Sequence, residues 1–205
     1  MKNSTKLFLS PIILGINLSL LLSLSSCDSG GEEIEQNATI IVTPPADPSN
    51  TSASDDNGGN DDSAAIADNQ ATYINQITIG VNTERNSNGG LAPLLREPNL
   101  DAMAAAHNIA MRDSAPVNAD PIQINHNNYQ DRADQVFGLG YSRFGENVGG
   151  IRGYATSQVS NAFINGWINS PGHLANILGD FTHTGVDVLV DPTDGTIYAT
   201  QIFAK

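Results

Sequence analysis

Residues 28–68 have a composition that is incompatible with a hydrophobic core. They carry ten of the 22 acidic residues of this chain and no lysine or arginine, and Pro, Ser, Asn and Gly occupy most other positions. Such a segment buries too little apolar surface to offset the conformational entropy lost on folding. We interpret residues 27–70 as a disordered acidic tether and expect one folded domain over residues 71–205. For the apolar run at residues 38–43 we favour an isolated patch over a short strand or a docking segment.

The first residues have the pattern of an export signal. Lys2 and Lys6 precede an apolar run over residues 7–24, which Pro11 and Asn17 interrupt. A basic start followed by a broken apolar run is typical of a signal peptide rather than of a membrane-spanning helix. We therefore expect the chain to be exported.

Cys27 is the only cysteine of the chain, and its context predicts a lipid anchor. Residues 24–27 read Leu-Ser-Ser-Cys, which resembles the bacterial lipobox, the signal after which the cysteine is lipidated. We predict a lipoprotein signal peptide over residues 1–26 and membrane attachment through a lipid on Cys27. A plain signal peptide with an incidental cysteine is the alternative, although an unpaired thiol is a liability in an oxidising compartment.

The distribution of acidic and basic residues indicates where the protein is located and which partners it is unsuited to bind. The acidic residues within 28–33 resemble the surface-export signals of some Gram-negative lipoproteins, so we expect the outer membrane or cell surface rather than the inner membrane. From Ala71 onward the chain has twelve acidic and seven basic residues and no basic cluster. This balance makes nucleic acid a poor partner.

Hydrophobic periodicity in the folded part predicts helices first and the clearest strands last. We expect helices over residues 71–85, 99–112, 131–136 and 157–167, with Asn99 and Ser157 as N-caps. The β-branched residues of the first segment leave a strand as its alternative. Residues 143–150 indicate a loop that leads into a short strand, and residues 185–190 and 196–203 predict a C-terminal β-hairpin. The pattern indicates an α+β fold in which helices pack on an antiparallel sheet.

Pro171 forces a helix break beside a histidine. Proline cannot continue a helix and Gly172 relaxes the backbone, so we expect His173 at the start of a new short turn. Bends of this kind often carry function. Together with His126 and Glu146 further upstream, His173 suggests a site built from two imidazoles and one carboxylate.

The order of several short motifs resembles that of a bacterial member of the CAP superfamily, which includes cysteine-rich secretory proteins, venom antigens and plant pathogenesis-related proteins. The motifs are residues 81–85 and 90–94, Ala106-His107, His126, Gly145-Glu146-Asn147-Val148, Trp167 with Ser170-Pro171-Gly172-His173, and Asn176-Ile177-Leu178. Each is short, but together they cover residues 74–205 in a specific order. The resemblance implies an α-β-α sandwich with a cleft that carries two histidines and two acidic residues.

The resemblance assigns three of these four positions. His126 matches the first cleft histidine, Glu146 the acidic residue of the Gly-Glu-Asn motif, and His173 the second histidine. Many eukaryotic relatives have a second acidic residue at the position of Ser170. The site of this chain therefore has only one of the two carboxylates that some reactions require.

These residue types favour metal binding over nucleophilic catalysis. Two neutral imidazoles bind zinc, and a nearby carboxylate acts as a third ligand, as an acceptor for an imidazole N–H, or as a base toward bound water. We expect a weak Zn²⁺ site at His126, His173 and Glu146, with Glu146 as the candidate catalytic residue. Two alternatives stay open, namely a polar cluster without chemistry and a Ser170 nucleophile activated by His173.

Three other residues have structural interpretations. His107 lies within the apolar stripe of the helix over residues 99–112, so we expect a packed or half-buried histidine. Trp167 is expected in the core. We interpret His183 as an exposed loop histidine without a role.

The expected function is that of a lipid-anchored CAP-domain protein, exposed at the cell surface or in the periplasm, that binds a small apolar, glycan or protein ligand. The alternatives are a zinc-dependent hydrolase acting on peptide or cell-envelope substrates and a structural or adhesive surface protein. The activities of the family are too varied for the fold to select one.

Overall fold

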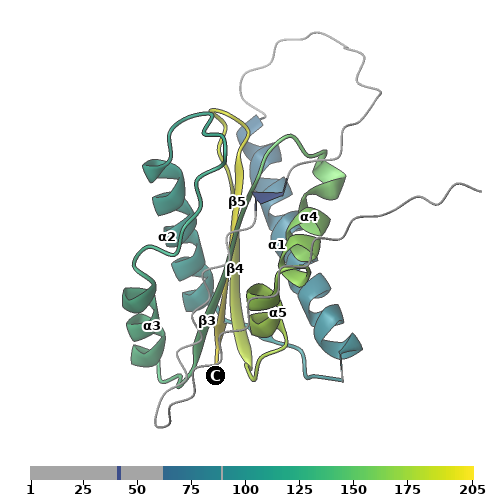
Figure 1. Cartoon of the computed structure of the whole chain (residues 1–205), viewed down its shortest axis with the longest axis vertical. Coiled ribbons are helices and arrows are strands. Elements are labelled where there is room, and N and C mark those ends of the chain that lie inside the picture. Colours follow the sequence, from purple (N-terminus) through teal and green to yellow (C-terminus); the bar gives the residue numbers. More distant parts are fainter. Residues whose placement is uncertain (1–40, 43–61, 89) are drawn as a thin grey trace, which may run out of the picture. The chain divides into compact units, whose positions relative to one another are not determined.

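A computed structural model describes residues 41–42, 62–88 and 90–205. The expected signal peptide over residues 1–26, Cys27 and most of the expected tether lie outside the described residues. In the described part, helices cover both faces of a five-stranded sheet (Figure 1). No helix of that part combines the length and the apolarity that crossing a bilayer requires.

The helices and strands form three layers. The helices are α1 (Asp62–Ser87), α2 (Pro98–Ser114), α3 (Tyr129–Gly138), α4 (Val159–Ile168) and α5 (Pro171–Ile177), with a 3-10 turn (Thr156–Gln158) before α4. The strands are β1 (Ile41–Val42), β2 (Leu95–Arg96), β3 (Phe144–Ile151), β4 (His183–Val190) and β5 (Ile197–Ala204). Helices α2 and α3 lie on one face of the sheet, and α1, α4 and α5 lie on the other (Figure 1). This is the expected α-β-α sandwich.

Strand β5 is the centre of the sheet, whose strand order is β1-β3-β5-β4-β2. Both β3 and β4 pair with it in antiparallel fashion, so that Glu146 lies opposite Ile202. All eight residues of β5 are buried. Strands β4 and β5 confirm the expected C-terminal hairpin, and β1 and β2 add short parallel pairs at the edges.

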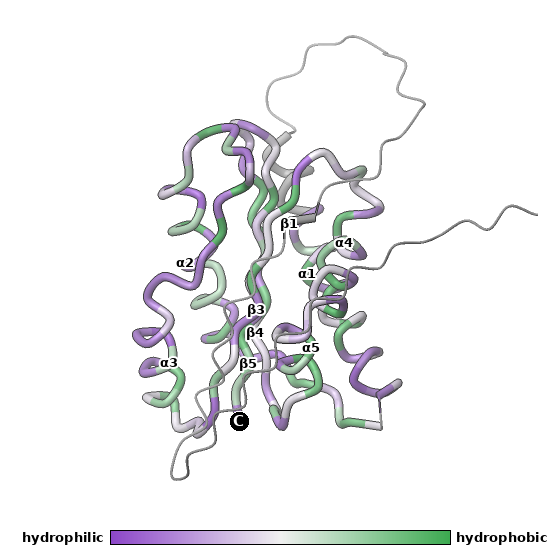
Figure 2. Tube along the Cα trace, in the orientation of Figure 1, coloured by the Kyte–Doolittle hydropathy of each residue, from purple (hydrophilic) through white to green (hydrophobic). Residues whose placement is uncertain are grey.

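Apolar side chains fill the interfaces on both faces of the sheet. The largest cluster includes Phe163, Trp167 and Phe203, so the expected core position of Trp167 is confirmed. Smaller clusters around Leu100 and Met111 lie on the α2 face. Figure 2 shows hydrophobic residues along the strands, whereas hydrophobic and hydrophilic residues alternate along the helices. A chain with a single cysteine has no internal disulfide, so burial of these side chains holds the domain together.

Helix α1 begins earlier than expected. It starts at Asp62 rather than Ala71, so the last part of the expected tether is helical. Residues 62–71 include four alanines, the residue with the highest helix propensity. Gln70 also donates a hydrogen bond to the carbonyl of Val188 at 2.7 Å, which attaches this end of the helix to the sheet.

Both expected N-caps are wrong. Helix α2 is capped by Glu97, whose carboxylate accepts a hydrogen bond from the backbone N–H of Leu100 at 2.9 Å, and not by Asn99. Ser157 lies in the 3-10 turn, and α4 has no side-chain cap. Glutamate is not among the preferred N-cap residues, so propensity favoured the asparagine.

Two segments that we expected to be irregular form strands. Ile41 and Val42 pair with Gly150 and Ile151, so the run at residues 38–43 contains a short strand rather than an isolated patch. The segment expected to be loop and short strand is the full-length strand β3, in which every residue after Phe144 is buried. Glycine lowers strand propensity. Because β3 contains three glycines, its sequence pattern did not predict a strand of this length.

Side chains bond to backbone groups of β3 and β4, the two strands that flank β5. On β4, the N–H of Val186 donates to Asp101 and its carbonyl accepts from Arg96, at 2.9 and 3.3 Å. On β3, the carbonyls of Glu146 and Val148 accept from Asn176 and Trp167, both at 3.0 Å. The short strands β1 and β2 each pair with only two residues of β3 and β4. The side chains therefore provide hydrogen bonds to buried backbone groups that no neighbouring strand pairs with.

Gly185 allows α2 to approach the sheet closely. A Cβ atom at this position would lie 2.1 Å from the backbone carbon of Leu100 and 2.4 Å from the backbone nitrogen of Asp101. Because these are backbone atoms of α2, rotation of a side chain does not relieve the overlap. We expect Gly185→Ala to lower the free energy of unfolding by about 3 kcal/mol, measured by urea denaturation.

Gly138→Ala is the matched control. Gly138 ends α3, and a Cβ atom there has no neighbour within 4 Å. Alanine at an unstrained helix position leaves stability unchanged or raises it by up to about 1 kcal/mol. Equal losses for the two variants would contradict the close approach at Gly185.

Candidate functional site

Glu146 of β3 is the centre of a buried polar cluster. Its side chain is fully buried, and both carboxylate oxygens accept hydrogen bonds. Arg132 of α3 donates from Nε to Oε2 at 2.5 Å and from Nη2 to Oε1 at 2.7 Å. His126 donates from Nδ1 to Oε1 at 2.8 Å. The carboxylate is therefore held by a bidentate ion pair and by one imidazole.

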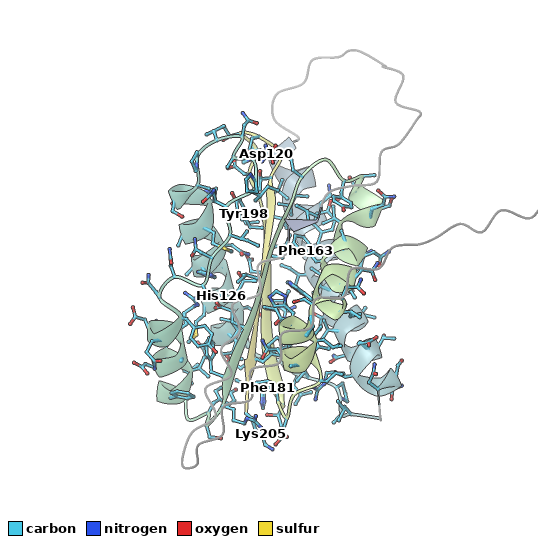
Figure 3. All side chains as sticks on the ribbon, in the orientation of Figure 1. Asp120, His126, Phe163, Phe181, Tyr198 and Lys205 are labelled. Carbon is cyan, nitrogen blue, oxygen red and sulfur yellow. The ribbon has the colours of Figure 1, made fainter. Side chains whose placement is uncertain are left out.

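The loop before α3 brings His126 to Glu146, and α3 itself brings Arg132. Asn128, the residue before the helix, has the left-handed conformation (φ 60°) that asparagine tolerates well. Arg132 also donates to the carbonyl of Asn127 at 2.7 Å, which fixes the loop against the helix. His126 consequently lies beside β3 on the α2–α3 side, whereas Phe163 and Phe181 lie on the opposite side (Figure 3).

The environment of Glu146 keeps its carboxylate ionised. Burial favours the neutral acid, but the hydrogen bonds from His126 and Arg132 and the charge of Arg132 hold the pKa of Glu146 below its usual value. A carboxylate that is paired with a guanidinium and has a low pKa is a weak general base. The candidate catalytic role of Glu146 is therefore disfavoured by its surroundings.

One ring nitrogen of His126 has no hydrogen-bond partner among the residues that the structure describes. Its Nδ1–H donates to Glu146, so in the neutral ring Nε2 carries the lone pair. This Nε2 is buried and accepts no hydrogen bond from the described residues. The carboxylate thus selects the tautomer that leaves Nε2 able to bind an electrophile.

His173 is the second imidazole with unpartnered nitrogens. It lies in the first turn of α5, two residues after Pro171, as expected, and is fully buried. Within the described part, neither Nδ1 nor Nε2 has a hydrogen-bond partner. Burial, and then the charge of His126, lower the pKa of His173 to about 4. His173 is therefore neutral at physiological pH.

The Ser170 alternative receives no support from this geometry. Ser170 precedes α5 as its N-cap, and its side chain makes no capping hydrogen bond. Because the nitrogens of His173 are unpartnered among the described residues, the imidazole does not hold the Ser170 hydroxyl as a base would.

The residues around Glu146 in the sequence join α5 to β3. Asn147 donates to the carbonyl of His173 at 3.2 Å and accepts from Asn176 at 2.9 Å. Asn176 also donates to the carbonyl of Glu146. A Cβ at Gly145 would lie 2.8 Å from Oδ1 of Asn176, so a larger residue here would displace this side chain. Much of the motif pattern therefore encodes the attachment of α5 to the sheet.

His107 and Arg132 belong to the cluster although sequence reasoning gave neither a role in the site. His107 is packed, as expected, and its Nε2 donates to the carbonyl of Asn125 at 2.9 Å and lies 3.9 Å from Oε1 of Glu146. Burial lowers the pKa of His107. Arg132 adjoins buried Ala133 and Val136 on α3, and this position on an apolar face was the available signal.

His183 differs from its interpretation as an exposed loop residue. It is the first residue of β4 and is partly buried. Its ring lies 5.2 Å from that of Tyr141, and Nδ1 is 2.9 Å from the hydroxyl oxygen of Thr182. It does not join the cluster around Glu146.

The potential metal donors of the cluster differ in how far they are already hydrogen-bonded. His126 and His173 have nitrogens without a partner among the described residues, whereas Glu146 is hydrogen-bonded at both oxygens. In the described part of the chain, no group of three His, Cys, Asp or Glu side chains is arranged to hold a metal ion. Glu146 as a third zinc ligand stays a prediction that the hydrogen bonding does not favour.

Comparisons with known proteins place this fold among its relatives. A sequence model of the cysteine-rich secretory protein family, CAP, matches residues 79–203. The uncharacterized protein YkwD of Bacillus subtilis strain 168 is 28% identical over 142 residues, which cover 66% of this chain and 48% of YkwD. The chain therefore spans about half the length of this curated relative. An outer surface protein from Borrelia burgdorferi has a similar fold, with a TM-score of 0.51 and 18% identity over 65% of this chain and 92% of that chain.

The low pKa of His173 predicts a pH-dependent stability. An unfolded histidine titrates near pH 6.5, whereas His173 in the folded protein titrates at about 4. Between these values the unfolded chain binds a proton that the folded chain does not, so stability falls as the pH falls from about 6.5 toward about 4. Above about pH 6.5 this group has no effect.

Urea denaturation between about pH 7 and pH 4 measures this loss, which we expect to reach roughly 3 kcal/mol. His173→Phe removes the titrating group and is expected to flatten the profile in this range. His183→Gln, outside the cluster, is the control. An unchanged slope in His173→Phe would show that His173 is not the group responsible.

Proposed function

This chain belongs to the cysteine-rich secretory protein family, and we propose that it is a lipid-anchored binding protein of the bacterial cell envelope whose polar cluster holds a divalent metal ion such as Zn²⁺. His126 and His173 are the ligands. Glu146 orients His126 and neither ligates the metal nor acts as a base. Ligand binding at the open metal positions is the function.

One observation carries this proposal, namely the buried nitrogens of His126 and His173 that lack partners among the described residues. Burying a polar atom without a partner is unfavourable, and each such atom in a folded protein calls for an explanation. Neutral imidazole is a strong zinc ligand. The low pKa of His173 supports this role, since the ring does not need to lose a proton before it binds a metal.

Glu146 supports binding rather than hydrolysis. A carboxylate that accepts the Nδ1–H of a metal-binding histidine fixes the orientation and tautomer of the ring. The guanidinium of Arg132 neutralises this carboxylate, so it is a poor acceptor for a proton from metal-bound water. The zinc-dependent hydrolase remains the alternative, and turnover of a peptide or cell-envelope substrate that Glu146→Gln abolishes would favour it.

A two-imidazole site leaves coordination positions open for a ligand of another molecule. Two protein ligands hold zinc weakly, and the remaining positions of its tetrahedral coordination accept water or an external donor. A small glycan or a protein side chain supplies such donors. An apolar ligand would need a different surface, so metal-linked binding favours the first two classes.

The proposed location rests on the N-terminal sequence and on one protein of similar fold. Residues 1–27 have the pattern of a lipoprotein signal with Cys27 as the lipidated residue, and the related Borrelia protein is named as an outer surface protein. Acidic residues follow Cys27 directly, as in some surface-exported lipoproteins. These features support an outer-membrane or cell-surface location for this chain.

Calorimetric titration of the purified chain in mild detergent with Zn²⁺ near neutral pH tests the metal site. We expect one ion to bind, and both His126→Ala and His173→Ala to weaken binding by roughly tenfold or more because each removes a ligand. His183→Ala, outside the cluster, keeps the wild-type affinity. A folded wild type that binds no zinc, or binding that survives both substitutions, would overturn the proposal and leave a structural polar cluster.

Cys27→Ser tests the anchor. We expect the wild type in the membrane fraction, released by detergent but not by salt, because lipid chains contribute about 0.8 kcal/mol for each buried CH₂ group. The variant loses incorporation of labelled palmitate. Ser26→Ala, which keeps the cysteine, is the control. Palmitate incorporation into Cys27→Ser would show that the anchor is elsewhere.

A further inference from the structure

We propose that Arg132 is the positioning residue of this site. It holds Glu146 as the acceptor of His126 and keeps the carboxylate out of the metal coordination sphere. The inference rests on the proposed function. It explains why Glu146 is not a third ligand beside the two imidazoles.

The first support is the orientation of the guanidinium. Its Nε and Nη2 donate to the two oxygens of Glu146, and Nη1 donates to the carbonyl of Asn127, which follows His126 in the chain. One planar group therefore fixes both the carboxylate and the loop that carries the imidazole. Arg132 is itself buried and has little freedom to leave this arrangement.

The second support is the occupancy of the carboxylate oxygens. Oε1 of Glu146 accepts hydrogen bonds from both Arg132 and His126, which uses both of its lone pairs. Oε2 accepts from Nε of Arg132. A metal ion at this carboxylate would have to replace a charge-assisted hydrogen bond and would lie beside a buried positive charge.

The third support is the difference between arginine and lysine. Arginine presents its donors in a rigid fork that matches a carboxylate, whereas lysine is a point charge on a flexible stem. Arg132→Lys keeps the charge that compensates Glu146 but loses the fork. We expect this change to free one oxygen of Glu146 for the metal and to loosen the hydrogen bond to His126.

Binding of Co²⁺ alone, followed by visible absorption in the full chain in detergent, measures the first effect. In the wild-type background, Glu146→Gln is expected to weaken cobalt binding less than in the Arg132→Lys background, because the amide oxygen still accepts from His126 and no metal ligand is lost. In the Arg132→Lys background, Glu146→Gln is expected to weaken binding by roughly tenfold or more beyond its effect in the wild type, since it removes an acquired ligand. Arg143→Lys, at a more exposed arginine, is the matched control.

Nitrogen-15 NMR of the histidine rings, without metal, measures the second effect. We expect His126 of the wild type to be a single Nδ1–H tautomer and that of Arg132→Lys to be a mixture of tautomers. This measurement needs only Arg132→Lys and not the double variant. We expect Arg132→Lys to fold because it keeps the positive charge beside Glu146. A purely structural role of Arg132 changes stability without changing the tautomer.

The outcomes separate this inference from the proposed function. If the wild type binds cobalt through the histidines but Arg132→Lys shows no dependence on Glu146, the inference is wrong and the metal site stands. If the folded wild type binds no cobalt, the metal site is wrong, and the tautomer decides whether Arg132 positions Glu146. An unchanged single tautomer in Arg132→Lys would overturn the inference by itself.

Discussion

The buried ion pair between Glu146 and Arg132 is the interaction on which the site depends. A carboxylate without exposure to solvent is stable in its ionised form only when it is paired and fully hydrogen-bonded. Removing one partner of such a pair typically costs about 3–5 kcal/mol, because the other charge stays buried. The pair therefore obliges α3 to pack against β3, and it brings the loop that carries His126 to the same strand.

Alternation along β3 connects this pair to the opposite layer. Glu146 faces α3, and its neighbours Gly145 and Asn147 contact Asn176 of α5. Asn147 also holds the backbone of His173. Three consecutive residues of one strand thus position imidazoles from two layers of the sandwich, and the same three residues form the family motif. The motif therefore both packs α5 against β3 and positions the polar groups of the site.

The sequence by itself determined the elements that have strong local signals. Pro171 ended one helix and began the next, the turn before Ile197 produced the hairpin, and the order of short motifs identified the family and the sandwich. Local signals failed where tertiary contacts dominate. Gly145 of β3 lowers strand propensity but admits Asn176, and Glu97 caps α2 although propensity favours Asn99.

Only the tertiary structure decided the chemistry of the candidate site. His126, Glu146 and His173 were identifiable from sequence, but the pairing of Glu146 with Arg132 was not, because their proximity results from the packing of α3 on β3. That pairing converts a candidate base or third ligand into an orienting acceptor. Protonation and hydrogen bonding depend on burial and on neighbours from distant parts of the chain, and a linear sequence specifies these only through the folded structure.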